Sequence, residues 1–131
     1  MKKSLILLVL FLLGGCQSSL NPFPRGELQG DERQTNSFAF AADFQVLALE
    51  TRPQQPYTVN LMVVVINGEL YVDAAEQRRW HQHIMLDPRV RVGLGGHIYR
   101  AIAEKTADPV LAGRFLPGRV VYRLVPRAWS L

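Results

Sequence analysis

The residues that decide the fold are Leu61–Glu104, which read LMVVVINGELYVDAAEQRRWHQHIMLDPRVRVGLGGHIYRAIAE. This stretch contains two pairs of apolar segments, and each pair is interrupted by a two-residue turn, Asn67-Gly68 in the first and Gly95-Gly96 in the second. Asparagine and glycine accept the positive φ angles that tight hairpin turns require. The stretch therefore predicts two β-hairpins joined by a short helix.

The predicted helix has recognisable ends. Asp73 is followed three residues later by Glu76, which indicates a capping box at the start. Asp87-Pro88 ends the helix, because proline disfavours the α conformation of the residue before it. Trp80 and Ile84 lie four residues apart and share one face, which we expect to point inward.

The flanking sequence supplies the other strands. Phe44–Glu50 alternates and predicts the first strand, and Pro53 and Pro56 predict a loop over Thr51–Thr58. Val59–Ile66 is apolar for nearly its whole length, which indicates a strand buried on both faces.

The remaining segments complete the predicted sheet. Asp108-Pro109 is expected to start a second helix that ends near Phe115. Six strands and two short helices, joined mostly as hairpins, predict a mainly β fold with a six-stranded antiparallel barrel. Further strands are expected at Glu69–Asp73, Val90–Leu94, His97–Lys105 and Arg119–Val125.

The N-terminus has the pattern of an export signal. Lys2 and Lys3 precede the apolar run Leu5–Leu13, which is too short to span a bilayer. The following Leu13-Gly14-Gly15-Cys16 resembles the lipobox of bacterial lipoproteins, which are cut before the cysteine. That resemblance implies a signal peptide over residues 1–15 and a Cys16 that carries palmitate-type acyl chains. The alternative is an ordinary secretory peptide with a chance cysteine.

The lipobox resemblance also implies a subcellular localisation. Acyl chains on one residue give durable membrane attachment. Gln17 stands where an aspartate would retain a lipoprotein at the inner membrane. We therefore expect an outer-membrane lipid anchor in the inner leaflet, with the protein facing the periplasm. Residues 16–37 are rich in polar residues, proline and glycine, and predict a flexible tether ahead of a domain at 38–131.

Composition excludes some partners. Cys16 is the only cysteine, so no intramolecular disulfide can form. Removal of residues 1–15 leaves 13 basic and 11 acidic residues, a net charge of +2. The basic residues form no run, so we expect no nucleic-acid partner. His81 and His83 lie two apart on a helix and point in different directions, so we also expect no metal site.

Several motifs together resemble the split-barrel flavin-binding proteins, in particular the deazaflavin- or FMN-dependent nitroreductase-like group. The resemblance covers about 80 residues, from Phe44 to Val125, and implies an FMN-binding-protein-like split barrel. It also implies a homodimer with a cofactor site between the subunits. The matching elements are Tyr71-Val72, Trp80 with Ile84, Asp87-Pro88-Arg89-Val90-Arg91-Val92, Gly95-Gly96 and Asp108-Pro109.

The segments that would hold a cofactor depart from that family. Its members carry a G-R-K-S-G-type phosphate segment where this chain has the loop Thr51–Thr58. Arg52 could contact a phosphate, but the glycines that allow close backbone approach are missing. The resemblance points to Arg52, Arg78, Arg79 and Trp80 as residues that would bind FMN or a deazaflavin. Alternatively, the two adjacent arginines form a solvated face and Trp80 packs in the core.

Two functions of different class follow from these observations. In the first, the chain is a binding or structural module that kept the barrel and lost the cofactor. In the second, it is a flavin- or deazaflavin-dependent oxidoreductase that reduces a quinone or nitroaromatic acceptor. The missing phosphate segment favours the first. No catalytic residue can be assigned, and enzymatic activity stays open at this point.

Overall fold

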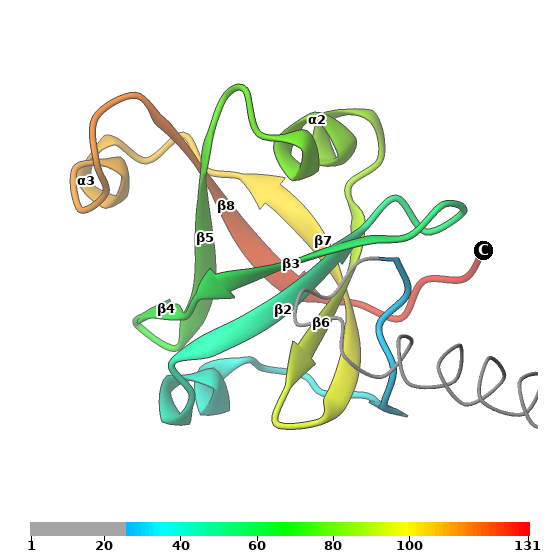
Figure 1. The fold of residues 1–131 in the computed structure, drawn as a ribbon. Helices are drawn as coiled ribbons and strands as arrows, with labels where there is room; N and C mark the ends of the chain where they lie inside the picture. The colour runs from blue at the N-terminus through cyan, green and yellow to red at the C-terminus, as the bar shows by residue number, and fades with distance from the viewer. Residues whose placement is uncertain (1–25) are drawn as a thin grey trace, which may run out of the picture.

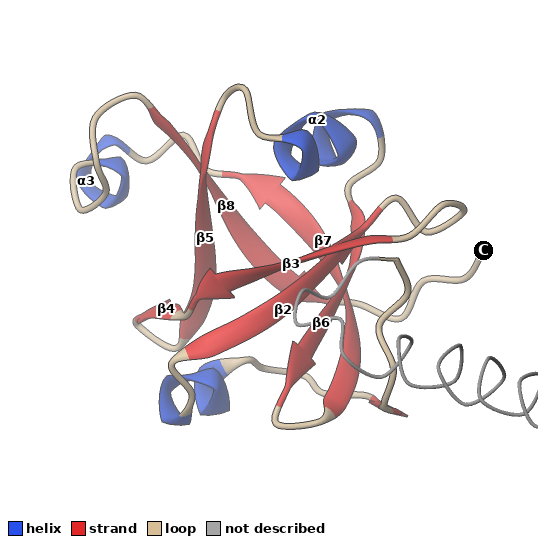
Figure 2. Ribbon diagram, viewed as in Figure 1, coloured by secondary structure: helices blue, strands red, loops and turns tan. Residues whose placement is uncertain are grey.

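The computed structural model describes residues 26–131. The predicted signal peptide and Cys16 lie outside the described residues. Among residues 26–131, no helix has both the length and the apolar character needed to cross a bilayer. The elements are, in chain order, β1 (Asp31–Arg33), the 3-10 helix η1 (Ala39–Asp43), β2 (Val46–Thr51), β3 (Tyr57–Met62), β4 (Val64–Ile66), β5 (Glu69–Ala75), α2 (Arg79–Leu86), β6 (Arg89–Leu94), β7 (His97–Lys105), α3 (Pro109–Ala112) and β8 (Arg119–Pro126) (Figure 2).

The strands form one curled sheet in the order β3-β2-β6-β7-β8-β5-β4, and all neighbours on this path are antiparallel. β3 and β4 stand at opposite ends of the order, yet Val63 alone separates them in the chain. This bent segment therefore closes the sheet into a barrel (Figure 1). The predicted mainly β antiparallel fold with two short helices is confirmed.

The path contains seven strands rather than six, because the predicted strand Val59–Ile66 bends. The N–H of Val63 donates to the carbonyl of Gln45 at 2.9 Å, and pairing changes there from β2 to β5. Burial on both faces was also a wrong expectation for this segment. Asn60 is exposed and Met62 is 78% exposed, since nothing among the described residues covers them.

Both predicted turns are confirmed. Asn67 and Gly68 have φ angles of 52° and 78°, and Gly95 and Gly96 have 59° and 85°. Gly95 is also required by packing, because a Cβ there would lie 2.7 Å from the ring of Phe44. Local sequence therefore fixes both hairpins of the central stretch.

The core fills the barrel and is closed at each end. α2 lies over one end and η1 lies at the other (Figure 1). As expected, Trp80 and Ile84 share the buried face of α2, with 5% and 3% exposure. Phe38, next to η1, is 2% exposed. Between them lie the inward residues of the strands, among them Leu47, Leu49, Leu70, Val72, Val90, Val92, Leu94, Ala101 and Leu124.

The predicted start of the first helix is wrong. Asp73 lies inside β5, opposite Val121 of β8, and α2 begins only at Arg79 with no side-chain cap. Pairing between β5 and β8 continues to Ala75, so the sheet ladder prevails over the local capping signal. The second helix starts as predicted, because Asp108 Oδ1 accepts the N–H of Val110 at 3.0 Å. It ends at Ala112 rather than near Phe115.

The predicted domain start at residue 38 is too late. Residues 26–33, here called the strap, lie against the outside of the barrel. β1 pairs in parallel with the first residues of β7, which β8 does not reach. Leu28 lies beside Gly93, where an added Cβ would be 3.5 Å from Leu28 Cδ1, and Gly30 lies beside Ile98. This part of the predicted tether is therefore folded; its residues 16–25 lie outside the described range.

Candidate functional site

A groove marks the place where the barrel is open. β3 pairs only with β2, and β5 beyond Tyr71 pairs only with β8, so the facing edges of β3 and β5 form no ladder. A cavity of about 650 Å³ lies there, here called the split groove. Its lining is Tyr57, Val59, Asn60, Leu61, Asp73, Ala75, Gln77, Arg78, Arg79, Trp80 and Arg119.

Positive charge dominates the split groove. Its single carboxylate, Asp73, is paired with Arg119, whose Nε lies 3.0 Å from Asp73 Oδ2. Arg78 and Arg79 are exposed and make no ion pair with any residue of the described range. They stand at the start of α2, where the first-turn amides lack a side-chain cap. Guanidinium groups and free helix amides together favour an anion.

Trp80 is part of the core more than of the groove. It is 5% exposed and packs in the main hydrophobic cluster. Only a small part of its ring reaches the split groove, so little of its face is open for stacking on a ligand.

Arg52 does not line the split groove. It has a positive φ of 58°, and its Nε donates to the carbonyl of Gln55 at 2.7 Å. The N–H of Gln55 in turn donates to the carbonyl of Arg52 at 2.9 Å. The side chain of Arg52 is thus held inside its own tight loop.

His83 connects this loop to α2. Its Nδ1 lies 2.9 Å from Thr51 Oγ1, and its ring meets Tyr57 edge to face at 5.1 Å. Burial, together with the charges of Arg52 and Arg79, lowers the pKa of His83 below its ordinary value. The structure therefore brings both arginines near one histidine, although only Arg79 faces the groove.

Sequence reasoning missed Arg119 and Tyr57 as groove residues. Arg119 comes from the last strand and reaches the groove only because it pairs with Ala75. Tyr57 fell in the predicted loop but begins β3. Neither residue carries a local signal, since both depend on long-range strand pairing.

The acidic and imidazole side chains do not gather into a metal site. Across residues 26–131, no three histidine, cysteine, aspartate or glutamate side chains lie close enough to hold an ion.

No family model matches the sequence, and no curated protein matches it either. Solved structures do share the fold. One is a candidate pyridoxamine 5'-phosphate oxidase from Listeria innocua, with a TM-score of 0.58, 17% identity, and coverage of 69% of this chain and 90% of that one. Another is the conserved hypothetical protein Rv2991 from Mycobacterium tuberculosis, with a TM-score of 0.56, 19% identity, and coverage of 77% and 87%.

A third structure is HutZ, a heme storage protein from Vibrio cholerae, with a TM-score of 0.52, 15% identity, and coverage of 69% and 87%. Identities at this level carry the fold alone. The chain is thus similar to split-barrel proteins over most of the described residues, and its own fold is a split barrel.

Proposed function

We propose that the split barrel is a binding module that takes a phosphate-bearing small molecule in the split groove. The observation that carries this proposal is the pair of exposed arginines, Arg78 and Arg79, at the uncapped start of α2. Arg119 adds a third guanidinium on the same lining. A volume of about 650 Å³ lies within the range of small-molecule sites.

Two features support a cofactor site that is incomplete relative to the flavin enzymes. The side chain of Arg52 is tied to its own loop, and Trp80 is almost wholly buried. Neither is presented to a flavin ring or phosphate in this arrangement. We therefore propose that the protein binds its ligand without converting it.

The second candidate is a flavin- or deazaflavin-dependent oxidoreductase. The fold shared with a candidate pyridoxamine 5'-phosphate oxidase supports it. In such enzymes the cofactor performs the chemistry and the protein orients it. An oxidoreductase therefore does not require an assigned acid or base among the residues of this chain. A homodimer would fit the same proposal, and Val46 and Met62, exposed cross-strand neighbours, lie on a face that a second copy could cover.

A spectroscopic and calorimetric experiment separates the two. Residues 17–131 contain every strand of the described part of the chain and the whole core cluster, and leave out the apolar N-terminus. A stoichiometric flavin absorption band in the purified protein supports the oxidoreductase and contradicts the incomplete cofactor site. A colourless protein that binds FMN and inorganic phosphate but not riboflavin supports the module. A colourless protein that binds none of these, and no added deazaflavin, contradicts both.

Variants locate the binding. Arg78→Ala and Arg79→Ala should each weaken FMN binding by roughly tenfold, as expected for loss of one hydrogen bond to a charged group. Arg114→Ala is the matched control, because Arg114 is exposed and does not line the groove. Equal affinities for all three variants would place the ligand elsewhere.

The proposed localisation has a separate test. We propose export and lipid attachment at Cys16, with the outer membrane as destination, on the sequence pattern of residues 1–17 alone. Cys16→Ser should abolish fatty-acid labelling and membrane sedimentation of the full chain. Retention of both would refute lipidation.

A further inference from the structure

A second groove runs along another side of α2. It lies between this helix and the ends of β7 and β8, has a volume of about 840 Å³, and shares no lining residue with the split groove. We call it the α2–β8 groove. His81, Ile84, Ala103 and Tyr122 are buried and form its floor, and the other lining residues are Glu76, Gln82, Met85, Lys105 and Val120.

His81 presents an unused acceptor in this floor. The side chain is 3% exposed, and its Nδ1 lies 3.1 Å from the carbonyl oxygen of Glu76. A carbonyl only accepts, so Nδ1 carries the proton and the lone pair is on Nε2. Nε2 makes no hydrogen bond with the described residues and is not sealed inside protein, since His97 Nδ1 is the one such enclosed atom among them. Nε2 is therefore accessible, and His81 is one of the residues that line the groove.

Tyr122 packs against His81 and is also a lining residue of the groove. The side chain is 4% exposed, and its ring lies 5.6 Å from the ring of His81. Its hydroxyl also has no hydrogen-bond partner within residues 26–131 and is not enclosed. Burial raises the pKa of Tyr122, so the hydroxyl keeps its proton and can donate.

The groove thus combines two unpaired polar atoms with apolar walls. Both atoms are open to water rather than enclosed, so a ligand would replace hydrogen-bonded water there and gain in addition from contact with the apolar floor. A hydroxyl group is both donor and acceptor and can serve both atoms. Ile84, Ala103 and Val120 offer apolar contact to the rest of the molecule. The charged lining residues, Glu76 and Lys105, have opposite signs, so the lining carries no net charge that would select an anion or a cation.

We propose that the α2–β8 groove binds a small uncharged aromatic alcohol of the phenol class. Its hydroxyl donates to His81 Nε2 and accepts from the Tyr122 hydroxyl, and its ring lies on the apolar floor. This site is separate from the split groove and does not depend on the function proposed for it.

The probe is p-cresol, and toluene serves as a ligand of similar shape that lacks the hydroxyl. Both are titrated into residues 17–131 and followed by amide chemical shifts. We expect p-cresol to shift the signals of Ile84, Ala103 and Tyr122, and toluene to bind roughly tenfold more weakly, the fold-change for one net hydrogen bond. Equal affinities, or shifts confined to other residues, would overturn the proposal.

Two variants test the polar atoms individually. Tyr122→Phe and His81→Phe keep an aromatic ring and remove the hydroxyl or the lone pair. Each should weaken p-cresol several-fold and leave toluene unchanged, whereas Arg79→Ala, in the split groove, should change neither. If His81→Phe does not fold, Tyr122→Phe decides alone, and unchanged p-cresol affinity in that variant refutes the site.

Discussion

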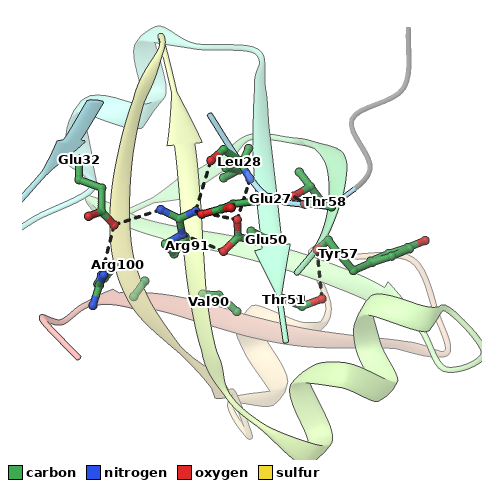
Figure 3. Close-up of polar contacts among 12 residues, drawn as sticks. Glu27, Leu28, Glu32, Glu50, Thr51, Tyr57, Thr58, Val90, Arg91 and Arg100 are labelled. Atoms are coloured by element: carbon green, nitrogen blue, oxygen red, sulfur yellow. Dashed lines mark hydrogen bonds and ion pairs between the residues drawn. The ribbon is translucent and has the colours of Figure 1, made fainter. Parts of the chain in front are cut away.

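At the scale of single residues, the most constrained contact is the ion pair between Glu50 and Arg91. Arg91 Nε and Nη2 donate to the two carboxylate oxygens of Glu50 at 2.8 and 2.9 Å (Figure 3). Their side chains are only 3% and 12% exposed although both point out of the barrel, because the strap covers them. The N–H of Leu28 donates to Glu50 at 2.7 Å, and Glu32 accepts from Arg91 at 3.1 Å.

Removal of one partner should therefore be costly. Glu50→Ala leaves the charge of Arg91 without its buried partner, and we expect a loss of about 3 kcal/mol in the free energy of unfolding, measured with urea. Arg33→Ala is the control, because its ion pair with Asp31 is more than half exposed, and it should cost less than about 1 kcal/mol. Similar losses in both variants would mean that the strap leaves the pair solvated.

His83 predicts a dependence of stability on pH. Burial, then Arg52 and Arg79, lower its pKa in the folded state, so the unfolded chain binds the proton more readily. This contribution to stability is complete above the unfolded pKa of about 6.5 and falls as pH decreases toward the folded pKa. Urea unfolding between about pH 8 and pH 5 should show the loss, and His83→Gln should remove it. Arg79→Ala should raise the pKa of His83 in an NMR titration; an unchanged value would contradict the charge effect.

At the scale of elements, the sequence predicts those features that residues close together in the chain determine. The Asn67-Gly68 and Gly95-Gly96 turns, the Asp108 cap and the inward face of α2 follow from residues close in sequence. The Asp73 cap fails because β8 pairs with β5 past that point. The family resemblance points to Arg78 and Arg79 as site residues, whereas Arg119 and Tyr57 reach the groove through long-range strand pairing and could not be predicted.

The turn of the β6–β7 hairpin allows the requirement for glycine to be tested. Gly95→Ala introduces a Cβ 2.7 Å from Phe44 at a φ of 59°, so it combines backbone strain with overpacking. We expect a loss of about 2–4 kcal/mol in thermal or urea unfolding. Gly96→Ala, at a φ of 85° with no atom within 4 Å of the added Cβ, should cost only the strain, about 1–2 kcal/mol.

A compensating change separates the two effects. Phe44→Ala combined with Gly95→Ala should cost less than the sum of the two single losses, because it removes the ring that the new Cβ meets. A double variant whose loss equals the sum of the single losses would show that strain alone acts at Gly95.

At the scale of the whole molecule, the strap makes residues 26–33 part of the folded unit. It was predicted as tether because its polar composition carries no apolar period, and its burial depends on Arg91 and Ile98, far along the chain. A chain that starts at residue 26 keeps the whole strap and serves as the reference. A chain that starts at residue 34 exposes Glu50 and Ile98 and should melt at a clearly lower temperature. Equal melting temperatures for the two shortened chains would show that the strap adds no stability.

The order of contacts along the strap has a mechanical consequence. Tension applied from the N-terminal side reaches Gly26 first, whose carbonyl accepts from Thr58 Oγ1 at 2.6 Å, then Leu28 on Glu50 and Arg91, and only then β1 on β7. Pulled from this side, these contacts would break in that order. β3 and β4 close the barrel without any of these contacts. A chain pulled from its N-terminal side would therefore release the strap while the barrel and both grooves stayed intact.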